Sequence, residues 1–188
     1  APPAAATPAL PAPEDACIAE QWRIARGELG GARQTITGLR GRSQGDEVPD
    51  EATVCAVLLD AMLAVSERQP DAIRFVERAD SVLRAGPVGD EMRAYATLAL
   101  TRLYRALGER EAALEAVRRR PYMRGWPHYL SSYLREEGRL AAQEGERAAA
   151  ARACEQYLAL RSAPDAELAS QVDSVKGELA RVNRRRGR

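Results

Sequence analysis

The feature that most constrains this chain is a pattern that occurs twice. Residues 95–117 read YATLALTRLYRALGEREAALEAV, and residues 132–154 read SYLREEGRLAAQEGERAAAARAC. Each segment predicts an amphipathic helix, a short turn centred on a glycine and a second, alanine-rich helix. The two turn glycines, Gly108 and Gly145, lie 37 positions apart. Recurrence at such a period is typical of helical hairpins that stack side by side.

The rest of the sequence predicts further helices and no sheet. Apolar residues recur with helical spacing, and no segment alternates apolar and polar residues beside turns of the kind that join strands. We therefore expect an all-α protein built from stacked antiparallel helical hairpins. Beyond the two hairpins, helices are expected from Glu14, over about Ala32–Arg40, after a cap at Asp50, from Pro70, and after Pro164. The first of these helices should bury an apolar stripe of Ile18, Trp22, Ile24, Ala25 and Leu29.

Composition divides the chain into three parts. Residues 1–13 contain five of the eleven prolines, and proline cannot donate a backbone hydrogen bond, so this segment is expected to be an extended arm. Residues 14–182 form the expected helical-repeat domain, and residues 183–188 form an arginine-rich tail. The arm either folds back on its own helices or lies along a partner protein; we favour the partner. The prolines expected to contact it are Pro2, Pro3, Pro8 and Pro11.

The residues of the two hairpins also carry a family resemblance. Large apolar, aromatic, turn-glycine and small residues follow one another in the order of a tetratricopeptide repeat, which the chain resembles. These residues are Leu100, Tyr104, Gly108 and Ala113 in the first hairpin, and Leu134, Gly138, Gly145 and Ala150 in the second, with Pro164 near the place of a closing proline. Thr97, Thr101 and Ala141 depart from the pattern. The period is also longer than the ~34 residues of that repeat.

The resemblance implies an α-solenoid whose function is docking. Residues 55–182 are similar to the C-terminal repeat regions of some bacterial serine/threonine kinases and transcriptional regulators. Those regions sense or dock and perform no chemistry, so the resemblance implies an interaction module.

Charge and hydropathy exclude several partners. The chain has 28 basic and 27 acidic residues and a formal net charge of +1, which predicts no bulk attraction to nucleic acid or anionic lipid. No apolar run is long enough to span a bilayer, because the best candidate, residues 53–65, is short and contains Asp60. We expect protein partners, with peripheral contact to a membrane surface at most and no transmembrane segment.

Three cysteines admit two interpretations. Cys17, Cys55 and Cys154 show no metal-binding spacing, and one histidine cannot complete a ligand set. The favoured interpretation is three small buried side chains; the alternative is a Cys17–Cys55 disulfide, which needs an oxidising compartment. The chain begins with Ala1, and a Pro/Ala-rich run follows, as after many export signals. We therefore expect a periplasmic protein, with a cytoplasmic one as the alternative.

No catalytic, metal-binding or cofactor-binding constellation is expected. His128 is a lone imidazole after a proline, and neighbouring carboxylates such as Glu136 and Glu137 point about 100° apart on a helix. Binding residues are more plausible among the aromatic and basic residues, since Tyr, Trp and Arg dominate interface energetics. The candidates are Tyr122 and Trp126 between the hairpins, and Arg184, Arg185 and Arg186 at the C-terminus.

The sequence therefore predicts a non-catalytic scaffold subunit that uses no cofactor. We expect it to stabilise a larger, membrane-associated bacterial assembly, for which respiratory, secretion and photosynthetic reaction-centre complexes are all suitable hosts. The alternative is a sensory or regulatory repeat domain of a kinase or transcriptional regulator that binds a peptide or ligand in its groove.

Overall fold

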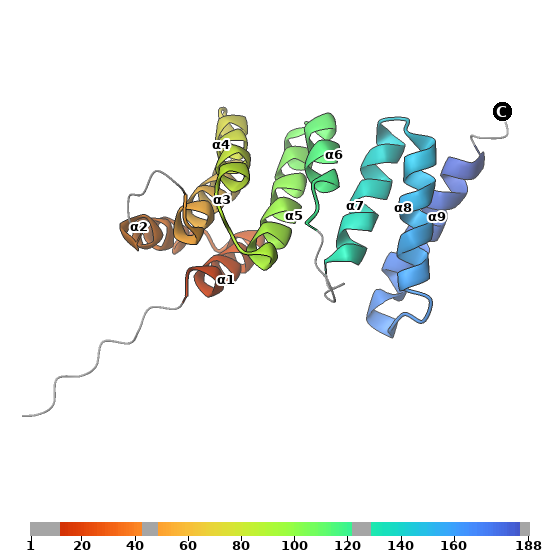
Figure 1. Cartoon of the computed structure of the whole chain (residues 1–188), viewed down its shortest axis with the longest axis horizontal. Coiled ribbons are helices and arrows are strands. Elements are labelled where there is room, and N and C mark those ends of the chain that lie inside the picture. Colours follow the sequence, from red (N-terminus) through yellow and green to blue (C-terminus); the bar gives the residue numbers. More distant parts are fainter. Residues whose placement is uncertain (1–11, 43–48, 122–128, 185–188) are drawn as a thin grey trace, which may run out of the picture. The chain divides into compact units, whose positions relative to one another are not determined.

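The computed structural model describes residues 12–42, 49–121 and 129–184. Within these ranges the chain forms nine α-helices and one 3-10 helix and contains no strand, which confirms the expected all-α class (Figure 1). The chain divides into two compact units, Ala1–Val88 and Gly89–Arg188. We call these unit 1 and unit 2, in chain order.

Unit 1 contains four helices arranged around a central one. They are α1 (Pro13–Ala25), α2 (Ala32–Arg42), α3 (Glu51–Ser66) and α4 (Ala72–Ala85). The central helix is α3, which contacts the other three. Its sequence is apolar on nearly every side, as a helix surrounded by neighbours requires. The Asp50 carboxylate begins α3 by accepting a 2.7 Å hydrogen bond from the Thr53 amide, so the expected cap is confirmed.

A disulfide joins α1 to α3 through Cys17 and Cys55, whose Cα atoms are 5.6 Å apart. The interpretation of these two cysteines as reduced buried side chains is therefore wrong, and the disulfide alternative is confirmed. Cys154 remains a free, buried thiol. The bridge joins two residues that are 38 positions apart in the sequence. It therefore restricts the conformations of the unfolded chain, which stabilises unit 1.

The disulfide also decides which face of α1 is buried. Cys17, Glu20 and Ile24 are almost fully buried, whereas Trp22 is 65% exposed. Trp22 follows Cys17 by five positions in the helix, which rotates the indole about 140° away from the bridge. The expected stripe through Trp22 is therefore wrong, and Leu29 lies beyond the end of α1 at Ala25.

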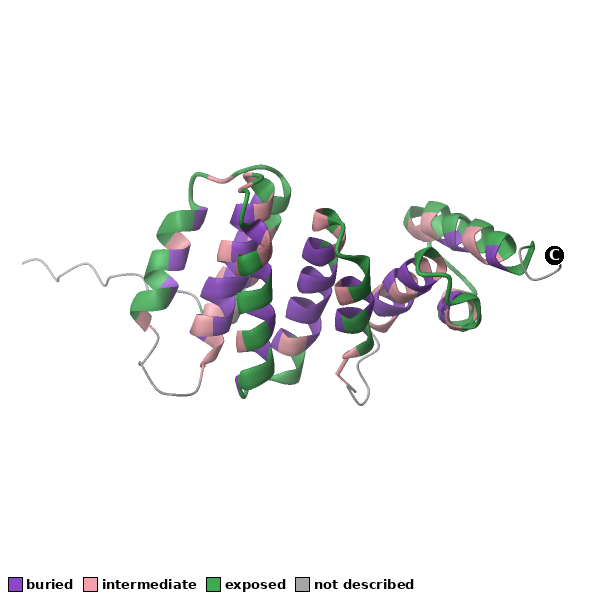
Figure 2. Ribbon diagram, turned by 90° about the horizontal axis from the view of Figure 1, so that it is seen from above, coloured by how far each residue is buried: buried purple, intermediate pink, exposed green. Residues whose placement is uncertain are grey.

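Unit 2 contains five α-helices that pack in chain order. They are α5 (Asp90–Leu107), α6 (Arg110–Arg118), α7 (Leu130–Gln143), α8 (Arg147–Leu160) and α9 (Ala169–Arg184), with the 3-10 helix η1 (Ala166–Leu168) before α9. Each helix contacts the next, and α7 also contacts both α5 and α9. Figure 2 shows the buried residues concentrated on the sides where helices face one another.

The second hairpin of unit 2 depends on small residues between its helices. Ala150 is fully buried, and a Cβ added to Gly138 would lie only 2.9 Å from Cys154 Sγ. Glycine and alanine therefore allow α7 and α8 to approach closely. The adjoining core contains Leu134, Ala153, Cys154, Tyr157, Val172 and Val175, so α9 turns its Val172 and Val175 inward.

Four helix pairs share one turn geometry. The turns follow α1, α3, α5 and α7, and each contains a residue with positive φ: Gly27, Arg68, Gly108 and Gly145. In every turn the next amide donates to the carbonyl five residues earlier, as in the Schellman motif. These bonds are Glu28 N to Arg23 O, Gln69 N to Ala64 O, Glu109 N to Tyr104 O, and Glu146 N to Ala141 O, at 2.8–3.0 Å. The two expected glycine turns are thus confirmed, and unit 1 contains two more.

Candidate functional site

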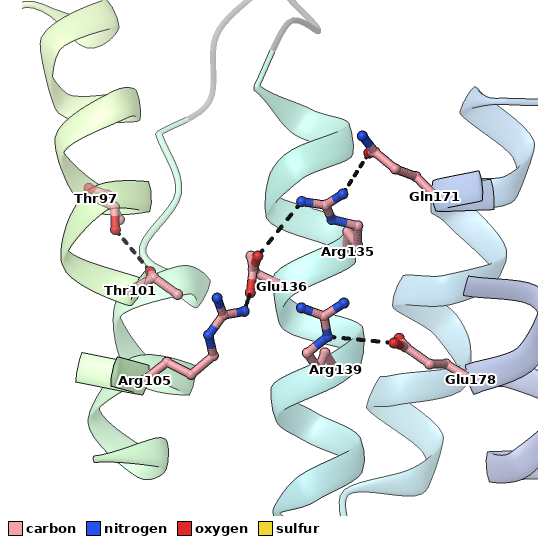
Figure 3. A network of polar contacts seen from close by, with 8 residues as sticks. All are labelled: Thr97, Thr101, Arg105, Arg135, Glu136, Arg139, Gln171 and Glu178. Carbon is pink, nitrogen blue, oxygen red and sulfur yellow. Dashed lines mark hydrogen bonds and ion pairs between the residues drawn. The ribbon is translucent and has the colours of Figure 1, made fainter. Parts of the chain in front are cut away.

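Polar side chains cross unit 2 from α5 through α7 to α9 (Figure 3). We call these residues the polar network: Thr97, Thr101, Arg105, Arg135, Glu136, Arg139, Gln171 and Glu178. They lie on helices that contact one another, because α7 packs against both α5 and α9. The polar network is the candidate functional face of unit 2.

Glu136 lies at the centre of the polar network. Only 2% of this residue is exposed, and its Oε2 accepts a 2.5 Å hydrogen bond from Arg105 Nη1 of α5. Arg135 Nη2 lies 3.9 Å from the other carboxylate oxygen. A buried carboxylate requires such compensation, because an unpaired buried charge costs several kcal/mol, on the order of 3–5. Arg105 and Arg135 therefore hold Glu136 as a structural counter-ion.

The polar network reaches α9 through two arginines on successive turns of α7. Arg135 Nη1 donates to Gln171 Oε1 over 2.5 Å, and Arg139 Nε lies 3.5 Å from Glu178 Oε1. Arg135 and Arg139 are four residues apart, so they lie on one face of the helix. Both α5 and α9 are thereby tied to α7 by charged or polar side chains.

Hydroxyl groups complete the α5 side of this face. The Thr101 hydroxyl donates to Thr97 O over 2.9 Å, and the Tyr133 hydroxyl of α7 donates to Ala94 O over 2.7 Å. Burial has the largest influence on the Tyr133 hydroxyl and raises its pKa, whereas a hydrogen bond with Thr97 lowers it. Tyr133 is therefore a neutral hydrogen-bond donor throughout the physiological range.

A second set of ion pairs joins α6 and the chain after it to the next hairpin. Arg118 Nη1 donates to Glu146 Oε1 over 3.1 Å, and Arg120 Nη1 donates to Glu137 Oε2 over 2.5 Å. The Arg118 guanidinium holds the pKa of Glu146 below its usual value, mainly by hydrogen bonding. These exposed or half-exposed pairs contribute little stability individually, but they fix which surfaces of the neighbouring helices face one another.

Next to the polar network, unit 2 has a groove of about 710 Å³ where the last turns of α7 and α9 meet the start of α8. Its charged lining consists of Arg139, Arg147, Arg181, Arg184 and Glu178. Among the described residues, the groove is therefore lined by four arginines and one carboxylate. The groove has the size of many small-ligand sites, which range from about 300 to 1,000 Å³.

The free thiol of unit 2, Cys154, is buried and protonated at neutral pH. Cys154 is 1% exposed, and burial raises its pKa to about 11, with smaller contributions from Glu178 and Glu155. Because the thiolate is the reactive form, the protonated thiol behaves as a small apolar side chain.

Two carboxylates of unit 1, the buried Glu20 and the half-buried Asp60, form contacts between helices. Glu20 is 1% exposed and accepts 3.1 Å hydrogen bonds from Arg23 of α1 and from the Thr35 hydroxyl of α2. Asp60 of α3 pairs with Arg40 of α2, and burial, its largest influence, raises the pKa of Asp60. Both carboxylates connect α2 to a neighbouring helix.

Of the expected binding residues, the described part of the chain contains Arg184 alone, which is exposed at the end of α9. The others lie outside the described residues: Pro2, Pro3, Pro8, Pro11, Tyr122, Trp126, Arg185 and Arg186. His128 lies outside them as well. Sequence reasoning missed the polar network, although its spacing gives a signal: Thr97, Thr101 and Arg105 recur every four residues within an apolar pattern.

Within the described residues, no group of three or more His, Cys, Asp or Glu residues is arranged to hold a metal ion. The described helices also include none with the length and apolar character needed to cross a bilayer. No protein-family model matches the chain, and neither does any curated protein or solved structure.

Proposed function

We propose that this chain is a non-catalytic helical-repeat protein that serves as a scaffold subunit of a larger assembly. The observation that carries the proposal is the turn shared by four helix pairs, with positive φ at Gly27, Arg68, Gly108 and Gly145. Recurrence of one structural unit along a chain is the signature of repeat architectures. The proposed architecture is a tetratricopeptide-like α-solenoid.

The packing of unit 2 supports this architecture. In a stack of hairpins, the first helix of each pair contacts the first helix of the next pair. In unit 2 the corresponding helices are α5, α7 and α9, and α7 contacts both of the others. Curved stacks of this kind present extended surfaces for binding, and such surfaces are the usual functional feature of repeat proteins.

The chemistry of the polar network favours docking over catalysis. Its ionisable groups pair with one another: Glu136 with Arg105, and Glu178 with Arg139. A catalytic acid or base instead needs reach to a substrate proton and a pKa near the working pH. The free thiol of Cys154 is buried, and burial raises its pKa to about 11, so it is protonated at neutral pH. The proposal therefore assigns the chain no reaction of its own.

The Cys17–Cys55 disulfide supports an extracytoplasmic location, because disulfides persist mainly in oxidising compartments. We propose a periplasmic subunit that lies peripheral to a membrane complex, with respiratory, secretion and photosynthetic reaction-centre complexes as the candidate hosts. The exposed Trp22 side chain on α1 is a suitable anchor for a protein partner, since tryptophan is enriched at binding hot spots.

The groove in unit 2 favours a second candidate function, a sensory or regulatory repeat domain that binds a ligand. Four arginines line a volume suited to a small molecule. A regulatory domain would respond to that ligand, whereas a scaffold would respond to its host complex.

The scaffold proposal is tested by removing the gene and measuring the host complex. The chain is first tagged at its chromosomal locus, and the complex that co-purifies in fixed stoichiometry is identified. In the deletion strain we expect less of that complex, while the surviving complex keeps its turnover per molecule. An unchanged amount of complex, or a loss of turnover per complex, contradicts a scaffold role.

A further inference from the structure

The contact between α1 and the rest of unit 1 is poor in apolar side chains. α1 packs mainly against α3, and the described side chains of α1 that are buried are Cys17, Glu20 and Ile24. Ile24 is the one aliphatic side chain among these three. By comparison, α4 packs on the same central helix with a longer apolar row buried: Ala72, Val76, Ala79 and Leu83. Because apolar burial is the main force that docks one helix on another, the attachment of α1 depends largely on the disulfide.

The buried Glu20 carboxylate weakens this contact further. Its Oε2 accepts hydrogen bonds from Arg23 and from the Thr35 hydroxyl. Its Oε1 is buried as well, but has no hydrogen-bond partner among the described residues. A buried polar atom without a partner loses its hydration and gains no bond in return. The disulfide and the Glu20 carboxylate therefore act in opposite directions on the docking of α1.

The segment between α1 and α2 is suited to act as a hinge. Residues 26–31 join the two helices and include Gly27, Gly30 and Gly31. A Cβ added at Gly27 or Gly30 would meet no atom within 4 Å, so the segment is not packed there. Hinges are usually a few such residues at the ends of helices. Both α2 and α4 have their own contacts with α3, so release of α1 would leave these three helices packed together.

We propose that α1 is a redox-dependent element of unit 1, docked on α3 when Cys17 and Cys55 are bonded and released when they are reduced. In the reduced chain α2, α3 and α4 stay packed, and the Glu20 carboxylate favours the released state of α1. A dithiol supplies the two electrons of the reduction. Its two sulfurs form a disulfide, the Cys17–Cys55 bond breaks, and the two thiol protons pass to the cysteine sulfurs. This inference goes beyond the scaffold function and does not depend on it.

The redox state of the bridge thereby determines whether the outer face of α1 is ordered. Trp22 lies on that face, 65% exposed, and its position relative to α3 is fixed only while α1 is docked. An oxidising compartment therefore creates this surface, and a reducing one leaves it unformed. Cys17 and Cys55 are both fully buried, so a dithiol reaches the bond of an oxidised chain only when α1 opens.

Hydrogen–deuterium exchange of the oxidised and the reduced full chain tests the inference. The chain is reduced with excess dithiothreitol in urea and returned to native buffer with the reductant present. Cys154 is a thiol in both samples, so they differ only at the bridge. We expect the protection of the α1 amides to fall about 30-fold to 1,000-fold on reduction, the range to which an ordinary disulfide contribution converts. The amides of α3 and α4 should stay protected. A released α1 loses its protection because an isolated helix of 13 residues is marginal in water.

Two matched variants test the part assigned to Glu20. In the reduced chain, Glu20→Met should raise the protection of the α1 amides about fivefold or more, because the unpartnered oxygen is gone. Glu28→Met makes the same change at an exposed position after α1 and should leave the protection unchanged. Equal protection of α1 in the oxidised and reduced chains overturns the inference. A loss of protection throughout α2, α3 and α4 on reduction, or equal effects of the two variants, overturns it as well. Each of these outcomes leaves the scaffold proposal standing.

Discussion

The Arg105 guanidinium of α5 lies 2.5 Å from the Glu136 carboxylate of α7, although Glu136 is only 2% exposed. This pair connects the first helices of two successive hairpins through a buried charge. Taking a carboxylate out of water is unfavourable unless a partner of opposite charge and good geometry replaces the water. The relative placement of α5 and α7 therefore depends on both residues together, and the energetic coupling between them is measurable.

Removing either member of this pair should lower the free energy of unfolding, because the remaining side chain is then a charge without its partner. Arg105→Met leaves the buried Glu136 carboxylate without its hydrogen-bonded partner and should lower the free energy of unfolding by about 3–5 kcal/mol. Glu136→Met leaves the half-exposed Arg105 and should lower it by about 1–3 kcal/mol. The double variant should cost less than the two single changes added together, because it leaves no unpaired buried charge. Urea unfolding of the four proteins measures this coupling. Strict additivity would show that the pair does not hold α5 against α7.

The close approach of α7 and α8 predicts opposite effects for two glycine substitutions. Gly138→Ala should lower the free energy of unfolding by about 1–3 kcal/mol, because the new methyl group would meet Cys154 Sγ at 2.9 Å. The matched control Gly177→Ala in α9 meets no atom within 4 Å and should stabilise the protein by about 0.4–1 kcal/mol. Adding Cys154→Ala to Gly138→Ala should recover part of the loss. Equal effects at the two glycines would contradict the packing.

Of the four residues with positive φ in the helix-to-helix turns, Arg68 is the only one that is not glycine, and we expect its backbone to be strained. Its φ is 55°, a region that costs a side-chain-bearing residue roughly 1–2 kcal/mol. Arg68→Gly should therefore raise the free energy of unfolding by about 0.5–1 kcal/mol after the greater flexibility of the unfolded chain is subtracted. Gly108→Ala, where φ is 86°, should lower it by a similar amount. Thermal unfolding at one pH checks both signs, and a destabilising Arg68→Gly would refute the common geometry.

The disulfide predicts a simple count of thiols. Protein prepared from the periplasm and denatured without reductant should take up one alkylating group per chain, at Cys154, and three after reduction. Mass spectrometry gives the count directly. Cys17→Ser/Cys55→Ser should lower the free energy of unfolding by about 2–4 kcal/mol, the range found for loops of this length. Three labels without reductant would contradict the bridge.

Cys154 predicts a loss of stability in alkaline solution. Its pKa is about 11 in the folded protein and about 8.5 in an unfolded chain. Between these values the unfolded state has lost the thiol proton and the native state retains it, so the stabilisation is complete below pH 8.5 and is lost as pH rises towards 11. The wild type should lose on the order of 1–3 kcal/mol more than Cys154→Ala over this interval. Parallel pH profiles in urea unfolding would contradict a buried, protonated thiol.

Local sequence signals predicted the helices and some of their ends. The Asp50 cap and the glycine turns at Gly108 and Gly145 follow from short-range chemistry that a single sequence displays. The turn at Arg68 was not predicted, because only a glycine indicates a left-handed backbone conformation in the sequence, and an arginine does not. Its presence becomes visible only when the backbone of α3 and α4 is known.

Long-range relationships were harder to predict. The orientation of α1 depends on the Cys17–Cys55 bridge. The apolar spacing of the sequence predicted that Trp22 is a core residue, whereas the bridge turns its side chain towards solvent. The polar network likewise joins residues 31 positions apart, such as Arg105 and Glu136. Spacing within one helix indicated its faces, but only tertiary packing showed which charges meet.

The central claim is that this chain works as a fixed part of a larger assembly, and native mass spectrometry of the chromosomally tagged protein tests it most directly. The protein is released from native membranes in mild detergent and measured without denaturation. We predict one dominant particle in which this chain is present with other subunits at constant stoichiometry. A bare chain at its own mass, with no companion subunit in any preparation, would contradict the claim.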